Sequence, residues 1–121
     1  MGDERLYLED ILEAAKSIET FLRNATNEDL VASDLLQSAI IQKFSVIGEA
    51  SSKLSRGLRS RFPQVEWRKI IGIRNIMVHA YFAVDWNLIW ETVEIDLPLL
   101  RKRIDEIIQL EFDTISPKDI D

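Results

Sequence analysis

The 121-residue chain contains no cysteine, only one histidine, and few glycines and prolines. Without cysteine it forms neither disulfides nor thiolate metal sites, and a reducing compartment is its natural setting. No cluster of carboxylates surrounds His79 in the sequence, so we expect no typical zinc or two-metal site and no cofactor. No apolar run reaches the roughly 20 residues of a membrane span, and residues 1–4 do not resemble the start of a secretory signal. We therefore expect a cytoplasmic protein that does not enter a membrane.

The net charge of −6 is unevenly distributed along the chain. Residues 35–81 carry eight basic and two acidic side chains, whereas residues 1–34 and residues 82–121 each have a net charge of −6. A local positive field of this kind can attract a polyanion although the whole molecule is acidic. The same run of charge is also typical of a solvated helix surface. Charge alone leaves both interpretations open.

Hydrophobic residues recur every three or four positions almost throughout the chain, which predicts an all-α protein. The length predicts a single domain over residues 1–121, with a polar tail from about residue 113. Asp3 and Ser33 are the expected N-caps of two helices that end near Leu22 and Leu54. Between them, the polar residues 24–29 break the pattern.

The second half of the chain predicts further helices after a basic connector at residues 55–63. One helix is expected from about residues 65–67 to Ala80, and another after an Asp85 N-cap. Asp96 is expected to cap a renewal of that last helix, with Pro98 in its first turn. Together these segments predict an antiparallel bundle of four to five helices.

Two features of this bundle suggest close neighbours. Gly48 lies inside a predicted helix, where glycine costs about 1 kcal/mol relative to alanine, and we interpret it as a point where another helix or a ligand approaches closely. Apolar residues make up 46% of the chain, more than one small bundle must bury. An exposed patch that includes Met77, Val78 and Phe82 would then favour a homodimer.

Residues 74–81, Arg-Asn-Ile-Met-Val-His-Ala-Tyr, concentrate chemically able side chains in one short segment. On a helix Asn75 and His79 share a face, and Arg74 flanks it. An arginine binds two phosphate oxygens through its planar fork. A histidine with a pKa of about 6.5 can take a proton from a ribose 2′-hydroxyl or return one to the leaving oxygen. The segment therefore predicts metal-independent RNA cleavage, although the same spacing also fits a polar helix surface without catalysis.

The single histidine leaves this chemistry one proton-transfer group short, because acid–base cleavage uses two. A two-fold dimer that pairs the segments around residues 74–81 would bring two copies of His79 toward one cleft. Dimerisation would then be part of the mechanism.

Residues 74–81 also match the Arg-x4-His-x-Tyr motif of the HepT-like proteins, a branch of the HEPN superfamily. Further segments resemble the same family in order along residues 3–112: Ile-Gly-Glu-Ala at 47–50, Trp-Arg-Lys-Ile-Ile-Gly at 67–72, and the stretches 84–90 and 96–98. The resemblance implies a HEPN-like helical-bundle homodimer whose motif helices face each other across a cleft.

The resemblance further implies a toxin of a toxin–antitoxin pair that cleaves RNA, with Arg74 and His79 as the catalytic residues and Asn75 as an accessory. Its partner would be a MntA-like minimal nucleotidyltransferase, the antitoxin. Tyr81 matches the tyrosine to which that antitoxin attaches AMP from ATP. The added charge and bulk would occupy the place of an RNA phosphate and silence the toxin. Glu49 is carried over only as a motif match that either orients Arg74 or His79 or keeps two helices in register.

Two questions stay open at this point. The sequence does not fix the RNA target, for which tRNA is one candidate. The alternative function is that of a non-catalytic HEPN dimer that binds nucleotide or nucleic acid and partners a nucleotidyltransferase, and a dimer in which the motif only orders its helix is a third.

Overall fold

The computed structural model describes residues 3–79 and 83–113, together with their side chains except those of residues 76–79. These residues form six helices: α1 (Asp3–Leu22), α2 (Asn27–Ala32), α3 (Asp34–Lys53), α4 (Arg56–Arg61), α5 (Trp67–His79) and α6 (Trp86–Glu111). No strand occurs in this part of the chain. The prediction of an all-α bundle is confirmed. The predicted residues Ala80 and Phe82, and the tail beyond Asp113, lie outside the described residues.

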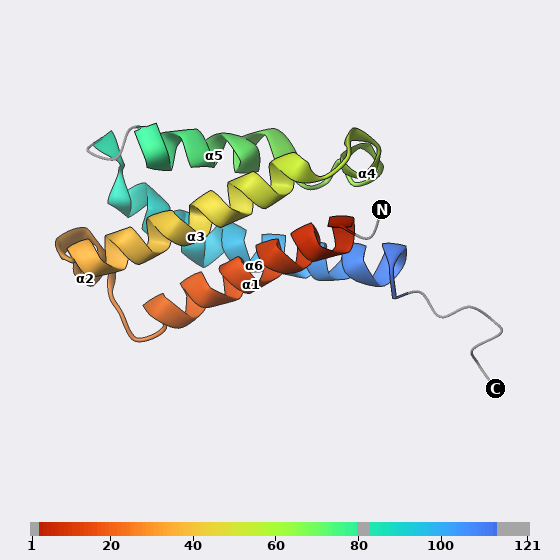
Figure 1. The fold of residues 1–121 in the computed structure, drawn as a ribbon. Helices are drawn as coiled ribbons and strands as arrows, with labels where there is room; N and C mark the ends of the chain where they lie inside the picture. The colour runs from red at the N-terminus through yellow and green to blue at the C-terminus, as the bar shows by residue number, and fades with distance from the viewer. Residues whose placement is uncertain (1–2, 80–82, 114–121) are drawn as a thin grey trace.

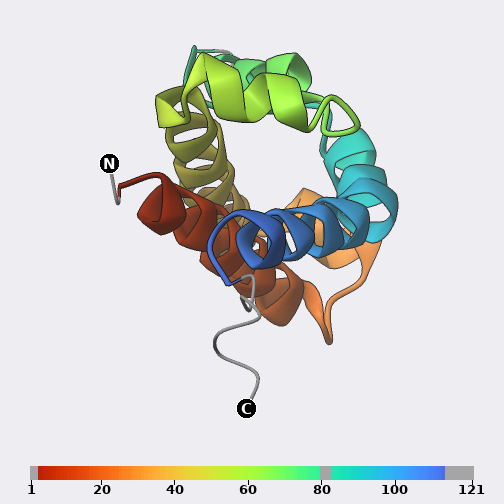
Figure 2. The same ribbon diagram turned by 90° about the vertical axis from the view of Figure 1, so that its right-hand side faces the viewer.

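The four long helices run alternately up and down the bundle (Figure 1). Helix α3 lies between α1 and α5 and packs against both, and α1 also packs against α6. Viewed along the bundle, α5 and α6 close the ring on the side opposite the α1–α3 contact (Figure 2). Helix α5 therefore takes most of its support from α3. None of the described helices is long and apolar enough to cross a membrane.

The two short helices were not predicted, and local capping explains both. Thr26 and Asp29 form a capping box, in which the Thr26 hydroxyl accepts from the Asp29 N–H at 3.1 Å and the Thr26 N–H donates to the Asp29 carboxylate at 2.9 Å. This box starts α2 within the segment that we expected to be a polar break. Ser55 accepts from the Leu58 N–H at 3.0 Å and starts α4 within the expected connector.

The expected caps at Ser33 and Asp85 are confirmed. Ser33 accepts from the Leu36 N–H at 3.1 Å, and Asp85 accepts from the N–H groups of Asn87 and Leu88. Asp3, in contrast, is the first residue of α1 rather than the residue before it. A boundary shift of this size is common.

The expected renewal of a helix at Asp96 is wrong, because α6 runs without a break from Trp86 to Glu111 with Pro98 inside it. A proline in a helix interior costs about 3 kcal/mol, since it removes one backbone hydrogen bond and crowds the preceding turn. The buried residues Val93, Leu97 and Ile104 continue in one register on both sides of Pro98. Their burial, at about 1.5–3 kcal/mol for each large side chain, offsets that cost.

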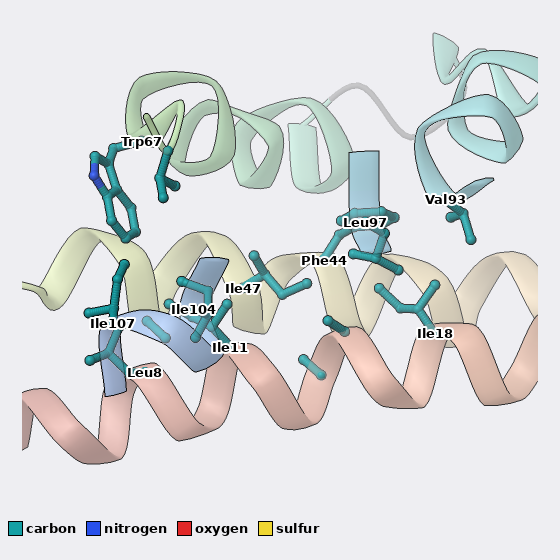
Figure 3. Packing of buried hydrophobic residues seen from close by; sticks show 14 of the residues in the cluster. Leu8, Ile11, Ile18, Phe44, Ile47, Trp67, Val93, Leu97, Ile104 and Ile107 are labelled. Carbon is teal, nitrogen blue, oxygen red and sulfur yellow. The ribbon is translucent and has the colours of Figure 1, made fainter. Parts of the chain in front are cut away.

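The core lies where α1, α3 and α6 meet (Figure 3). Ile11 and Ile18 of α1 and Ile104 of α6 are fully buried, and Phe44 of α3 is 3% exposed. Trp67 closes one end of this core, and its indole N–H donates to the carbonyl of Phe62 at 3.0 Å. Because Trp67 is the first residue of α5, this contact fixes where that helix begins.

Polar links join three chain segments at the end of the bundle that holds both described termini. The Glu4 carboxylate accepts from the Ser55 N–H at 2.6 Å, Arg61 pairs with Glu111 at 2.8 Å, and Arg5 pairs with Asp113 at 2.8 Å. Partial burial acts to raise the pKa of Glu4, but hydrogen bonding from Ser55 and the charge of Arg61 outweigh it and lower that pKa. The pKa of Arg61 is raised by its bond to Glu111.

Candidate functional site on helix α5

The candidate site is carried by α5, whose start is anchored on both sides. Trp67 bonds to Phe62, as described above, and Arg103 of α6 donates to the carbonyl of Gln64. These contacts hold the connector before α5 against the bundle. The direction of α5 across α3 then determines where the residues of its last two turns lie.

Arg74 lies where α5 passes close to Gly48 of α3. A Cβ atom built on Gly48 would lie 2.8 Å from the Cβ of Arg74 and 3.2 Å from the carbonyl oxygen of Ile70. Carbon atoms normally rest about 3.5–4.0 Å apart, so only glycine fits at this position. The expectation that Gly48 permits a close approach is confirmed, and the neighbour is a helix.

The Arg74 residue is exposed although its stem packs against α3. It makes no ion pair or side-chain hydrogen bond with any residue whose side chain the structure describes. An arginine stays charged at any physiological pH and binds phosphate in a planar, bidentate manner. Among the described side chains, Arg74 is therefore a cation without an anionic partner, and its exposure leaves it accessible to an anionic ligand.

Asn75 follows Arg74 and is also exposed. The backbone of His79 lies in the same helix, four residues further on, so the two positions share a face. The structure thus places three of the predicted site residues on the last two turns of one helix. The side chain of His79, and Tyr81 altogether, lie outside the described residues.

Glu49 points elsewhere than its neighbour Gly48. Its carboxylate lies 3.6 Å from the Lys53 ammonium and lines a shallow depression with Tyr7 and Asp10 of α1. The Lys53 ammonium in turn lies 5.7 Å from the centre of the Tyr7 ring. No bond joins Glu49 to Arg74 among the described residues. Glu49 therefore lies on the α1 side of α3, where its ion pair is with a residue of its own helix.

A cavity of about 240 Å³ lies between α3, α5 and α6. Its walls are largely apolar, with Phe44 and Ile47 of α3, Ile73 of α5 and Leu100 of α6, and none of Arg74, Asn75 and Glu49 lines it. The exposed residues of the motif lie outside this cavity, so the candidate site is a surface of α5 rather than an enclosed pocket. Within the described part of the chain, no group of three or more acidic or histidine side chains could hold a metal ion.

Two further residues of this helix, Arg68 and Gly72, were not among the predicted site residues but share a face with His79. Arg68 is exposed, and a Cβ atom on Gly72 would meet nothing within 4 Å. The signal that could have found them is spacing, since they precede His79 by eleven and seven residues and thus fall on its helical face.

The comparisons with known proteins agree with the family resemblance found in the sequence. The family model described as "Ribonuclease HepT-like" matches residues 11–107. A protein of Thermococcus cleftensis named "Probable ribonuclease HepT" is 37% identical over 101 residues, which cover 84% of this chain and 92% of the relative. No solved structure gives a significant match.

Two further relatives carry names that assign them provisionally as RNases. One, from Methanocaldococcus jannaschii, is 33% identical over 103 residues that cover 85% of this chain and 94% of the relative. The other, from Caldanaerobacter subterraneus, is 34% identical over 111 residues that cover 92% of this chain and 99% of the relative. From the family model and these near full-length relatives, we conclude that the chain belongs to the HepT-like family of the HEPN superfamily.

Proposed function

We propose that this protein is the ribonuclease toxin of a toxin–antitoxin pair, which cleaves RNA without a metal through Arg74 and His79. The observation that carries the proposal is Arg74, which is exposed and has no partner among the described side chains, held by the Gly48 contact next to Asn75 in a chain of a ribonuclease family. A cation at a fixed position on a rigid helix is what stabilisation of a phosphoryl transition state requires.

In the proposed reaction, His79 takes the proton of a ribose 2′-hydroxyl, and the 2′-oxygen attacks the adjacent phosphorus. The bond from phosphorus to the 5′-oxygen breaks, and that oxygen takes a proton from a second acid. The products are a 2′,3′-cyclic phosphate and a 5′-hydroxyl end, so no water and no metal enters this step. Arg74 binds the phosphate oxygens as their negative charge grows. In a homodimer, the second acid is His79 of the partner subunit.

The test is RNA cleavage in excess EDTA, with tRNA among the substrates. We expect His79→Ala to lower the rate by about 10²–10⁴-fold, the usual contribution of a positioned proton-transfer group. Arg74→Ala keeps the Cβ that packs on Gly48 and removes the exposed remainder of the side chain with its guanidinium, so its stability should change by no more than about 0.5 kcal/mol while cleavage falls. Arg23→Ala removes an exposed cation at the end of α1, across α3 from α5, and should cleave normally.

Equal cleavage by the unmodified protein and His79→Ala would reject this mechanism. If neither cleaves but both bind RNA, the function is that of the non-catalytic binding module. The single histidine of the chain is the feature that favours this second candidate, because an acid–base pair then depends entirely on a partner subunit. Sedimentation of the purified protein shows whether a partner subunit is present. A strict monomer would have only one histidine and could not form the acid–base pair.

Silencing through Tyr81 is the second part of the proposal. A nucleotidyltransferase antitoxin would transfer AMP from ATP to the Tyr81 hydroxyl and release pyrophosphate. Incubation with that enzyme and ATP should then add one adenylate to the intact mass and abolish cleavage. Tyr81→Phe should not be modified, whereas Tyr7→Phe, which changes the only other tyrosine, should be modified normally.

A further inference from the structure

One face of α5 carries a regular series of four positions, two of which, Arg68 and Gly72, have no part in the proposed reaction. Arg68, Gly72, Asn75 and His79 are spaced by four, three and four residues. At 100° per residue they fall within an arc of about 60°, and the series spans about 16 Å along the helix. Arg68 and Asn75 are both exposed. We call these four positions the α5 strip.

Gly72 in the middle of the strip has no packing role within the described chain. A Cβ atom there would meet nothing within 4 Å, whereas one on Gly48 would lie 2.8 Å from Arg74. A glycine in a helix interior weakens the helix relative to alanine, because it has more freedom to lose on folding. Since no neighbour in the described chain requires this glycine, we look for the reason outside the chain. Glycine permits a ligand to approach the helix backbone closely.

The charges beside Gly72 indicate what kind of ligand approaches. Lys69 is neutralised by Glu66 at 3.0 Å. Arg68, the adjacent residue, makes no ion pair or side-chain hydrogen bond within the described part of the chain. Arg68 and Arg74 are therefore two cations on α5 without a partner in the described chain, one at the far end of the strip and one beside Asn75. At 100° per residue, Arg74 lies about 120° around the helix from Arg68, so an extended anion meets both only if it turns off the strip beside Asn75.

We propose that the α5 strip is a track for the sugar–phosphate backbone of the RNA strand, with Arg68 as a phosphate-binding residue remote from the cleaved bond. The proposal rests on the function proposed above. Arg68 binds a phosphate at one end, Gly72 lets a sugar lie against the helix, and Asn75 leads the strand to Arg74 and His79. At roughly 3.4 Å per stacked nucleotide step, the strip accommodates about five steps.

The α5 strip could instead pack against the α5 strip of a second copy of the chain. A dimer formed in this way would fit the proposed chemistry poorly. If two α5 helices crossed antiparallel at Gly72, their His79 residues would lie about 21 Å apart along the axis, seven residues to either side. They would not share a cleft. If the helices crossed parallel, the two unpaired Arg68 side chains would meet and repel each other.

The experiment measures binding of a fluorescent 2′-O-methyl RNA oligonucleotide, which cannot be cleaved, over a range of salt concentrations. Arg68→Gln should weaken binding and reduce the slope of log affinity against log salt by about 0.7, the value for one phosphate contact on a single strand. Lys69→Gln, the same charge change one residue away, should leave the slope unchanged. Equal slopes for the two variants would overturn the assignment of Arg68.

Gly72→Ala provides an independent readout that a merely structural role would not produce. We expect a higher melting temperature together with weaker RNA binding, because the added methyl favours the helix but obstructs the strand. Gly57→Ala in α4, where a Cβ atom meets only ordinary contacts, is the control and should not weaken binding. If Gly72→Ala binds RNA as tightly as the unmodified protein, the proposal is overturned. It is also overturned if Gly72→Ala loses the mass of a dimer, because this face would then be covered by a second copy of the chain.

These measurements separate the two proposals. If the unmodified protein binds the oligonucleotide with the Arg68-dependent slope but never cleaves natural RNA, the strip stands and the catalytic function fails. If it cleaves RNA in EDTA but Arg68→Gln and Gly72→Ala bind like the unmodified protein, the catalytic function stands and the strip fails.

Discussion

Replacing Gly48 with alanine tests whether the close contact between α3 and α5 determines where Arg74 lies. The added Cβ would stand 2.8 Å from the Cβ of Arg74 and 3.2 Å from the carbonyl oxygen of Ile70. Both neighbours are backbone or next to backbone, so a change of side-chain rotamer cannot relieve the contact. Reaching the usual carbon–carbon distance of about 3.5–4.0 Å requires α5 to move by about 0.7 Å or more.

The expected effect on stability combines two opposing contributions. Overpacking of a close contact costs about 1–3 kcal/mol, and rigid neighbours place Gly48→Ala in the upper half of that range. Alanine returns about 1 kcal/mol through its higher helix propensity. The free energy of unfolding should therefore fall by about 1–2 kcal/mol. For a domain of this size, that lowers the melting temperature by about 3–12 °C.

The effect on activity should exceed the effect on stability. A displacement of about 1 Å in a catalytic group can reduce a rate by about 10²-fold. RNA cleavage should therefore fall strongly in Gly48→Ala at temperatures where the variant is fully folded. Thermal melts with Gly57→Ala and Gly72→Ala as matched controls check the reasoning, because both lack the steric conflict. If Gly48→Ala melts above the unmodified protein, as Gly72→Ala should, the contact does not fix α5 and our account is wrong.

Three further substitutions test the rest of the fold. The buried Gln37 amide donates two hydrogen bonds of 2.9 Å to the carbonyls of Leu30 and Val31 near the end of α2. Gln37→Leu removes both and should lower the free energy of unfolding, measured by chemical denaturation, by about 2–4 kcal/mol. Gln42→Leu, at an exposed position, should lower it far less. Phe44→Ala should cost about 3–5 kcal/mol, and a smaller loss would mean that the core collapses around the vacancy. Glu4→Gln removes a carboxylate whose pKa is lowered on folding. The variant should therefore be less stable than the unmodified protein above the ordinary pKa of 4.5. This difference should vanish as the pH falls through the folded pKa, because the Glu4 carboxyl is then protonated. Melts at neutral pH and in strong acid check this sign, and a difference that persists in acid would refute it.

The long helices could be predicted because each buries one continuous stripe in the core. Ile11 and Ile18 of α1 illustrate this, since their spacing alone placed them on a buried face and both are fully buried. The short helices escaped prediction because each spans six residues and depends on a single cap. Pro98 misled us for a related reason. Its local preference for a first helical turn was outweighed by the buried stripe on either side of it.

The sequence predicted which residues of α5 form the candidate site, but not the helix contact that holds them in place. The motif spacing identified Arg74 and Asn75, and both are exposed on α5. Nothing in the sequence pairs Gly48 with Arg74 across 26 positions, because such a contact depends on how two helices cross. Glu49 shows the same limit, since its sequence neighbour faces α5 while its own carboxylate pairs with Lys53 toward α1. The direction of the α3 helix turns the Glu49 carboxylate away from Arg74, whichever of its two predicted roles Glu49 has.

The two glycines nearest the site act on opposite sides of α5, and their difference indicates how the helix works. Gly48 lets α3 hold α5 from within, so that the Arg74 stem is fixed while its charge stays exposed. Gly72 leaves open space on the outer side, beside an arginine without a partner in the described chain. A helix that is tightly held on one face and smooth on the other can present cations to a long polyanion without moving to accommodate it. Preorganisation of this kind lowers the entropy lost on binding, so the fixed inner contact and the open outer face would both favour the RNA binding proposed above.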